Sequence, residues 1–236
     1  MVEMITKRKS VRSYTDQPVP EEIWEKLRNF RMKPLYPEIG VKWEIVDRDD
    51  IRCMLKFITP KMIAIYSVKK DGYLENAGFM FQQMDLYLQS LGLGVCWLGM
   101  GKPNARVAEA VPGMDFVILL TVGYPDEDFR NGPEDFKREP MESITDQADP
   151  RLEPARLAPS SCNSQPWYFR HDGDVIHVFW DQKSLLTRKV LAYFNPIDIG
   201  ITLAHLYVTN PDTFRFFRTE GVSTPKGFVY MGSITL

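Results

Sequence analysis

Two short segments, far apart along the chain, hold side chains whose types and spacing suit ligand binding. The first is Arg8-Lys9-Ser10-Val11-Arg12. Alternate residues of an extended segment share one face, so Arg8, Ser10 and Arg12 can converge on one anion. Arginine forms planar, charge-assisted hydrogen bonds, and serine adds a neutral donor. The segment therefore predicts a grip on a phosphate monoester, and the alternative is a solvated basic N-terminal segment.

The second segment covers residues 158–167 and reads Ala-Pro-Ser-Ser-Cys-Asn-Ser-Gln-Pro-Trp. It concentrates hydroxyl and amide groups between two prolines that restrict the backbone. Such groups match the donor and acceptor edge of a planar heterocycle, although a turn that satisfies its own backbone is an equally simple interpretation. Taken together, the two segments predict a nucleotide-like cofactor with a phosphate end and a ring end.

Other chemistries have weaker support in the sequence. The glycine pairs at 92/94 and 99/101 do not form the G-x-G-x-x-G pattern of dinucleotide-binding folds. The three histidines have no ligand-like spacing with one another or with the cysteines, so no metal site is expected. Ser160 and Ser161 lack the G-x-S-x-G setting of a nucleophilic serine.

Composition is that of an ordinary globular protein. Of 236 residues, 44% are hydrophobic and 25% are charged, and the formal net charge is −2. This net charge does not indicate a binding surface for nucleic acid or for an anionic membrane. The longest apolar run, residues 116–120, is too short to span a bilayer, and residues 1–10 do not resemble a signal peptide. Three widely spaced cysteines favour reduced thiols in a cytoplasmic protein.

Hydrophobic periodicity predicts the elements of the first half. Helices are expected at residues 2–9, after Pro20 as far as Pro34, at 74–91, and from Asn104 to Val111. Strands are expected at 41–45, 62–68, 95–98 and 116–123, and the runs at 62–68 and 116–123 indicate interior strands. The helix at 74–91 is apolar around most of its circumference, so we expect it to be buried.

The polar stretch at residues 126–140 marks the best internal boundary. Beyond it we expect helices at 141–157 and 197–208, and strands at 165–170, 174–180, 214–218 and 227–234, with a hairpin turn at Asp172-Gly173. Strands and helices mix without strict alternation, which predicts the α+β class. Residues 76–98 and 196–218 are both expected to form a helix, a break and a strand, which is a weak sign of an internal repeat.

Three motifs together resemble the FMN-dependent nitroreductase family, over most of residues 4–170. They are Arg8-x-Ser10-x-Arg12 followed by Tyr14, the segment 91–99 (Leu-Gly-Leu-Gly-Val-Cys-Trp-Leu-Gly), and the turn at 158–169. Gly123-Tyr124-Pro125 before a polar loop that ends in Lys137-Arg138-Glu139-Pro140 also fits the family. The resemblance implies an α+β nitroreductase-like fold, with a central antiparallel-rich sheet flanked by helices.

The resemblance also implies a set of FMN-binding residues. The phosphate and ribityl chain would be held by Arg8, Lys9, Ser10, Arg12, Lys137 and Arg138. The ring would be contacted by Pro159, Ser160, Ser161, Asn163 and Gln165. Backbone N–H groups near Leu98 and Gly99 would face flavin N5 and O4. No side chain is assigned as a nucleophile or an obligatory acid.

One departure from the family pattern indicates how the chain is built. Family members carry the Pro-Ser-Ser-x-Asn turn after the first helices, where residues 31–37 stand here, and they form intertwined homodimers. This chain carries the turn in its second half. We therefore expect one unit, residues 1–236, in which an N-terminal half (1–138) and an abbreviated C-terminal half (139–236) form a fused pseudo-dimer. Such a chain can function as a monomer, and further self-association stays open.

Three functions are compatible with these expectations. The resemblance implies an oxidoreductase in which FMN takes a hydride from NADH or NADPH and passes electrons to a small nitro, quinone or similar acceptor. A second hypothesis is an FMN-binding module without turnover, used for sensing, storage or assembly. A third is a scaffold that has lost the flavin. The sequence does not indicate the acceptor or choose between NADH and NADPH.

Overall fold

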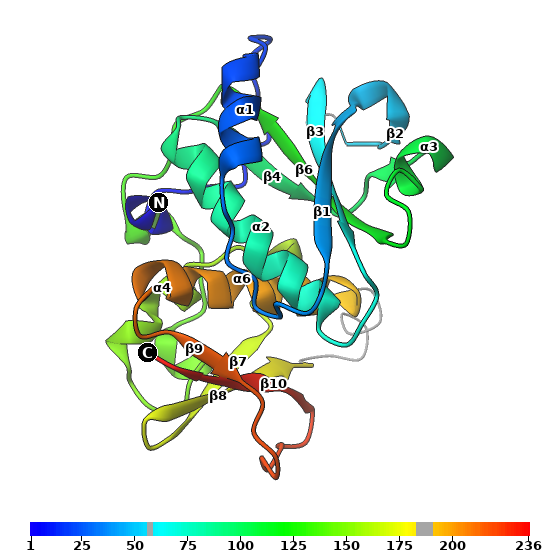
Figure 1. Ribbon diagram of the computed structural model, residues 1–236. Coiled ribbons are helices and arrows are strands. Elements are labelled where there is room, and N and C mark those ends of the chain that lie inside the picture. Colours follow the sequence, from blue (N-terminus) through cyan, green and yellow to red (C-terminus); the bar gives the residue numbers. More distant parts are fainter. Residues whose placement is uncertain (56–58, 183–190) are drawn as a thin grey trace.

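Two helices at the centre of the molecule separate two sheets. The computed structural model describes residues 1–55, 59–182 and 191–236. Helices α2 (Tyr73–Ser90) and α6 (Phe194–Thr209) lie side by side between two four-stranded antiparallel sheets (Figure 1). The α+β class is confirmed, with the strands divided between two sheets. No helix among the described residues has the length and apolar character that crossing a membrane requires.

The first sheet has the strand order β1-β3-β6-β4. Its strands are β1 (Val41–Asp47), β3 (Lys61–Ser67), β6 (Asp115–Gly123) and β4 (Gly94–Leu98). The two apolar runs expected in the interior form the two central strands, and the strand whose side chains alternate in polarity, β1, lies at an edge. The positions of all four strands agree with the sequence-based expectation.

The second sheet has the order β7-β8-β10-β9. Its strands are β7 (Trp167–Asp172), β8 (Val175–Asp181), β10 (Phe228–Thr235) and β9 (Arg215–Phe217). The predicted hairpin joins β7 to β8, and Gly173 adopts a φ of 61° in its turn, a conformation that glycine reaches without strain.

The remaining elements are short and lie around these layers. They are α1 (Glu21–Asn29), β2 (Ile51–Arg52), β5 (Lys102–Pro103), α3 (Ala105–Ala108) and α4 (Glu153–Arg156), with 3-10 turns at Val2–Ile5, Arg48–Asp50, Pro133–Asp135, Met141–Ser143, Pro150–Leu152 and Ser161–Asn163. Helix α3 is capped by Asn104 as expected but ends before Val111, because the residue preceding Pro112 disfavours the helical conformation.

The prediction of one continuous helix at residues 141–157 is wrong. The segment forms two 3-10 turns and then α4, which begins only at Glu153. Pro150 and Pro154 each occupy the first turn of a short helical piece, where the missing N–H is tolerated. In the middle of one long helix the same prolines would remove hydrogen bonds and clash with the preceding turn, so the helix is broken into pieces.

The two halves repeat one topology. Along the chain each sheet is built as two strands, a long helix and two further strands, and the strand orders correspond one to one. Each half also has a register shift at the same place, with an extra residue on its last strand: Val117 in β6 and Met231 in β10. A shared bulge is a specific feature, so the halves are related in detail as well as in outline.

The close crossing of α2 and α6 joins the halves. A Cβ atom on Gly78 would overlap the carbonyl oxygen of Ile197, and one on Gly200 would overlap the carbonyl oxygen of Glu75. These reciprocal contacts make Gly78 equivalent to Gly200, with a local two-fold axis between the helices. Only glycine allows two helix backbones to approach so closely.

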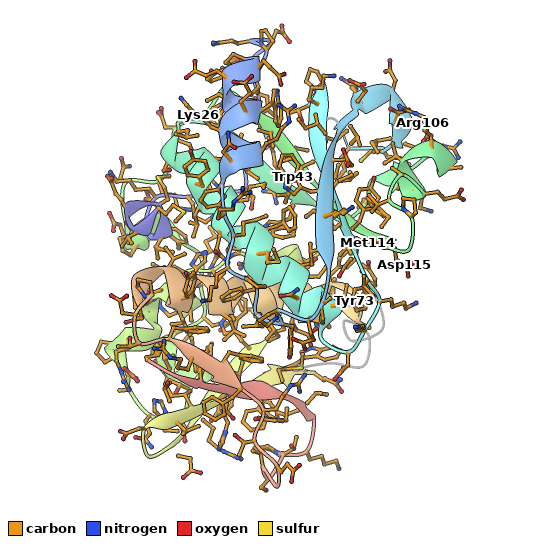
Figure 2. The ribbon with its side chains drawn as sticks, in the orientation of Figure 1. Lys26, Trp43, Tyr73, Arg106, Met114 and Asp115 are labelled. Carbon is orange, nitrogen blue, oxygen red and sulfur yellow. The ribbon has the colours of Figure 1, made fainter. Side chains whose placement is uncertain are left out.

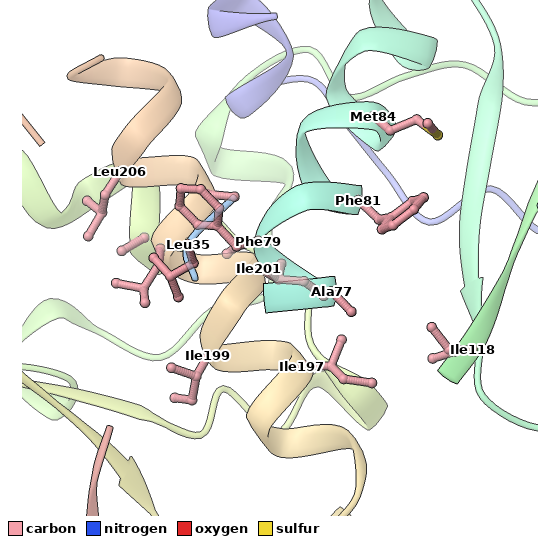
Figure 3. Close-up of a cluster of buried hydrophobic side chains, with 14 of the residues drawn as sticks. Leu35, Ala77, Phe79, Phe81, Met84, Ile118, Ile197, Ile199, Ile201 and Leu206 are labelled. Atoms are coloured by element: carbon pink, nitrogen blue, oxygen red, sulfur yellow. The ribbon is translucent and has the colours of Figure 1, made fainter. Parts of the chain in front are cut away.

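Side chains on the two helices complete a single core. In Figure 3, Phe81 and Met84 of α2 point to the side where Ile118 of the first sheet lies, and Ile199 and Leu206 of α6 point to the opposite side. One cluster of buried apolar residues includes members of both helices and both sheets. Figure 2 shows side chains filling the space between these layers. The halves therefore share one core and are not separate domains joined by a linker.

An ionic cluster fastens the 141–152 segment to β7. Nδ1 of His171 lies 2.8 Å from the Asp146 carboxylate, and Nε2 lies 3.2 Å from Asp149. Arg151 in turn pairs with Asp149 at 2.7 Å, the main reason that the pKa of Asp149 falls to about 2. Burial acts to lower the pKa of His171, but the hydrogen bonds and charges of the two carboxylates outweigh it, and the pKa is raised.

We expect Gly78→Ala to lower the free energy of unfolding by roughly 1–3 kcal/mol, because the added methyl group overpacks the helix crossing. Urea denaturation followed by circular dichroism measures the effect. Glu25→Ala, at an exposed position of α1, is the control and should change stability by less than about 0.5 kcal/mol. A stability gain in Gly78→Ala, as alanine gives in an unconstrained helix, would contradict the close crossing.

The raised pKa of His171 also makes stability depend on pH. Protonated His171 is favoured in the folded state, so its contribution is full below the unfolded pKa of about 6.5 and is lost as pH rises through the folded value. Urea denaturation between about pH 6 and about pH 8 should therefore show falling stability in the native chain. The slope should be smaller in His171→Gln. Equal slopes would show that the cluster does not hold a proton on His171.

Candidate functional site

Two adjoining cavities lie where the N-terminal segment, β4, the 159–163 turn and the start of α6 meet. The inner cavity, of about 110 Å³, includes Trp97 of β4 and Asp198 of α6 in its wall. The cationic cavity, of about 610 Å³, is lined by basic side chains from the N-terminal segment and from the 130–138 loop. Ser10, Arg12 and Ser160 line both cavities, so the two cavities adjoin each other.

Contacts with β4 and α2 position the N-terminal segment. Ser10 forms a parallel bridge with Val95 of β4, and the N–H of Val11 donates to the Val95 carbonyl at 3.1 Å. The buried guanidinium of Arg8 pairs with the buried carboxylate of Asp85 on α2 at 3.3 Å. The first motif is therefore anchored at Arg8 and Val11, which are buried, whereas Arg12 is exposed.

The basic residues around the cationic cavity differ in how they are compensated. Arg8 is balanced by Asp85, and the Lys9 ammonium lies 2.6 Å from Glu127. Burial, with repulsion from Arg8, lowers the pKa of Arg130 to about 10. Burial, with repulsion from Arg8 and Arg130, lowers the pKa of Arg138 to about 9. These shifts indicate a surplus of buried positive charge.

Arg138 is the clearest sign of an anion site. Its Nη atoms donate to Asn163 Oδ1 at 2.7 Å and to the Leu157 carbonyl at 3.2 Å, but its buried Nε has no hydrogen-bond partner. The guanidinium groups of Arg130 and Arg138 lie 4.1 Å and 5.3 Å from the centre of the Phe136 ring, which holds them near each other. An anion in the cavity would relieve both the missing hydrogen bond and the repulsion.

The 159–165 turn has an unusual backbone. Cys162, Asn163 and Gln165 adopt positive φ angles of 52°, 54° and 45°, which are uncommon for residues other than glycine. Ser160 Oγ accepts from the N–H of Gln165 at 2.9 Å, and Gln165 Oε1 accepts from the N–H of Glu139 at 2.8 Å. The turn thus satisfies part of its own backbone while Ser160 remains at the cavity wall.

The structure gathers most of the predicted site residues around the two cavities. The residues that line one cavity or both are Arg8, Lys9, Ser10, Arg12, Gly99, Lys137, Arg138, Pro159, Ser160, Ser161 and Asn163. Leu98 and Gln165 line neither of them. Leu98 is buried in the core at the end of β4, and the Gln165 amide is bonded within the turn and to Glu139. The side chain of Asn163 is likewise bonded to the 137–138 segment.

Sequence reasoning missed Arg130, Trp97 and Asp198. Arg130 stands in a polar loop whose composition indicates a solvated boundary, and its approach to Arg8 is a long-range contact with no local signal. Trp97 belongs to the 91–99 motif, but the sequence alone assigned no role to its side chain. Asp198 stands in a largely apolar helix, and a lone acid among buried residues was the available signal.

Hydrogen bonds fix Trp97 at the wall of the inner cavity. Its indole N–H donates to Gln82 Oε1 at 3.1 Å, and the Gln82 amide lies 3.1 Å from His205 Nε2. Nδ1 of His205 lies 2.9 Å from the Pro154 carbonyl, which can only accept, so Nδ1 carries the proton. Burial lowers the pKa of His205 to about 3 and keeps the ring neutral, and burial raises the pKa of Cys96 in the cavity wall to about 11.

The symmetry-related position in the other half is filled. Counted from the shared bulge, Phe216 of β9 is equivalent to Trp97 of β4, and Arg218 to Gly99. The Tyr36 ring packs edge-on against Phe216 with centroids 5.3 Å apart, and its hydroxyl accepts from Arg218 at 2.9 Å. Tyr36 therefore occupies the place that corresponds to the inner cavity. Within the described residues, only the side of the helix pair that carries Trp97 therefore keeps this cavity open.

No group of three or more metal-ligating side chains occurs in the described part of the chain. The chemistry that the cavities offer is therefore recognition of an anion by arginine and lysine, next to a cavity walled by an indole, hydroxyl groups and a buried carboxyl.

Comparisons with known proteins give consistent results. A family model described as "Putative TM nitroreductase" matches residues 1–210. The crystal structure of a "putative nitroreductase" from Thermotoga maritima matches with a TM-score of 0.69 and 22% identity, covering 99% of this chain and 91% of that chain. It shows that the fold is shared over almost the whole length. A comparison with curated proteins found no match.

Two further solved structures match part of the chain. A nitroreductase family protein from Clostridium difficile has a TM-score of 0.49 and 18% identity, covering 63% of this chain and 99% of that chain. A "putative nitroreductase" in complex with FMN, from Desulfovibrio desulfuricans, has a TM-score of 0.44 and 21% identity, covering 61% of this chain and 94% of that chain.

Proposed function

The chain belongs to the putative TM nitroreductase family, and from this premise we propose that it binds FMN and acts as an NAD(P)H-dependent oxidoreductase. Its acceptor would be a nitro compound, a quinone or a similar small molecule. One observation carries the proposal: the Nε atom of half-buried Arg138 is buried without a partner, and its guanidinium faces repulsion from Arg8 and Arg130, in a cavity that adjoins the inner cavity. A phosphate ester with a planar ring fits this pair of cavities.

The residues present fit the two ends of FMN. The phosphate and ribityl chain would lie in the cationic cavity, held by Arg12, Arg130, Lys137 and Arg138, with Ser10 as a neutral donor. Arg8 would contribute its charge from behind, because its guanidinium is paired with Asp85 on α2.

The ring would lie in the inner cavity. There Trp97 and Phe194 supply apolar surface, and Ser160 and Ser161 supply hydroxyl groups. Apolar walls with a few fixed polar groups are the usual form of a cofactor site. Backbone N–H groups near Leu98 and Gly99 are proposed to face N5 and O4 of the ring.

Bound FMN would supply the redox chemistry by accepting a hydride at N5 and passing electrons on. The chain would bind and orient the ring and exclude water from its buried side. Positive charge around the cationic cavity would favour a ligand that gains negative charge on reduction. A pKa of about 11 keeps the Cys96 thiol protonated, and a pKa of about 3 makes His205 a weak base, so neither is proposed as a nucleophile or a base.

We further propose that residues 1–138 and 139–236 are the fused halves of a pseudo-dimer, and that one chain is functional as a monomer. The repeated topology and the shared core support this, because the α2–α6 contact joins the halves as a subunit interface would. The three cysteines are free, which agrees with a cytoplasmic location where thiols stay reduced.

FMN titration tests the phosphate grip. We expect wild type to bind about one FMN per chain, since Tyr36 fills the symmetry-related position of the inner cavity in the other half. Arg138→Gln should weaken FMN by about ten- to a hundredfold, because charge-assisted hydrogen bonds contribute roughly 1.5–3 kcal/mol. Riboflavin, which lacks the phosphate, should bind both proteins equally. Flavin fluorescence at fixed ionic strength measures all four affinities.

Arg156→Gln is the matched control, because it removes the same charge from a neighbouring residue that lines neither cavity. It should change FMN affinity by less than about threefold. If Arg138→Gln weakens riboflavin as much as FMN, Arg138 does not bind the phosphate.

Anaerobic reduction tests the enzymatic proposal. Flavin absorbance of the loaded protein should bleach on addition of NADH or NADPH and return on addition of a nitroaromatic or quinone acceptor, with hydride transfer as the physical basis. Bound FMN that is not reduced by either nucleotide would favour a binding module without turnover. A protein that binds no FMN would favour a scaffold that has lost the cofactor.

A further inference from the structure

Asp198 is a buried acid in the wall of the inner cavity. It stands in the second turn of α6, and 3% of its surface is exposed. One carboxyl oxygen accepts from the N–H of Ser161 at 3.0 Å. The Asn195 amide, oriented so that its oxygen accepts from Trp180 Nε1 at 3.0 Å, donates to the other oxygen at 3.3 Å. Both of these partners are neutral, and among the described residues no cation pairs with the carboxyl.

The equivalent residue in the other half shows which part of this arrangement is structural. The reciprocal contacts of Gly78 and Gly200 make Asn76 of α2 equivalent to Asp198 of α6. Asn76 Oδ1 accepts from the N–H groups of Leu35 and Tyr36 at 2.8 Å and 2.9 Å. An amide side chain can therefore hold the loop packed against its helix in the same way that the Asp198 carboxyl does. The acid is present only in the half where the loop borders a cavity.

Burial raises the pKa of Asp198 well above its ordinary value, with the Ser161 N–H as the opposing influence. Of the described residues, the other ionisable groups that line the inner cavity are Arg12, Cys96 and Cys162, and Glu75 of α2 lies behind α6 at the helix crossing. The Cys96 thiol stays neutral. A buried carboxyl in this setting carries a proton and is a hydrogen-bond donor.

We propose that Asp198 is a ring-binding residue whose carboxyl O–H donates a hydrogen bond to a carbonyl or imine acceptor of the heterocycle in the inner cavity. The inference rests on the proposed function, because it takes the ring of FMN as the occupant. A neutral donor adds no negative charge beside a ring that becomes more negative on reduction, which an ionised carboxylate would do. Asp198 thus distinguishes a ring with an acceptor at this edge from one without.

Three variants separate the donor from the loop contact. Asp198→Asn keeps an acceptor for Ser161 and an N–H donor, so FMN affinity should stay within about threefold of wild type. Asp198→Ala removes both, and affinity should fall by about three- to tenfold. Asn76→Ala, the control, removes the equivalent loop contact in the filled half. It should lower the stability of the protein and leave FMN affinity unchanged.

Two spectroscopic readouts report on the ring itself. A ring C=O or C=N vibration of bound FMN should shift between wild type and Asp198→Ala, because loss of a hydrogen bond to the acceptor atom strengthens that double bond. It should keep its position in Asn76→Ala, because Asn76 lies in the filled half. The midpoint potential should be the same in wild type and Asp198→Asn, because both side chains are neutral. A higher potential in Asp198→Asn would show an ionised carboxylate in wild type and overturn the proposal, as would unchanged vibrations and affinity in Asp198→Ala.

The protein without FMN provides an independent test of whether the Asp198 carboxyl is protonated. Its infrared spectrum at neutral pH should contain a protonated-carboxyl band that is missing from Asp198→Asn, and absence of that band from wild type would overturn the proposal. Failure of the proposed function has a different signature. Wild type would then bind no FMN, whereas failure of the Asp198 proposal leaves wild type and Asp198→Ala binding FMN alike.

Discussion

The close approach of α2 and α6 at Gly78 and Gly200 is the constraint on which the rest of the molecule depends. It brings the start of α6 against the end of β4, so that residues from opposite halves wall one cavity. It also buries α2 from both sides, which places Asp85 where it can pair with Arg8. A wider helix separation would open the core and leave the two binding motifs too far apart to share a ligand.

The two halves use one topology for opposite purposes. Around Trp97 the 160–163 turn leaves an open cavity, whereas around Phe216 the ring of Tyr36 fills the equivalent space and Arg218 caps it. Filling the second space adds apolar contact to the core and removes a cavity that would weaken packing. Both halves contribute residues to the open cavity, and that cavity lies on one side of the helix pair.

Elements with strong periodicity could be predicted from the sequence, and contacts between distant segments could not. The strands of both sheets and helices α2 and α6 follow from local apolar patterns, because those patterns record which face is buried. The prediction of a helix at 141–157 was wrong because two prolines at the starts of short helical pieces prevent one continuous helix, despite the favourable composition of the segment. Arg130 and Asp198 were missed because their roles arise from contacts that are not local in sequence: Arg130 with Arg8, 122 positions away, and Asp198 with Ser161, 37 positions away.

The cationic cavity shows how binding and stability are linked in this fold. Partial burial of Arg130 and Arg138 close to Arg8 is unfavourable in the free chain, as their lowered pKa values indicate. Phe136 and the Leu157 carbonyl hold the guanidinium groups in place without neutralising them. An anion that enters the cavity therefore stabilises the folded state as well as forming its own contacts, since it binds the native chain and not the unfolded one. In the proposed function, the same charges that are unfavourable in the free chain would favour the binding of a phosphate.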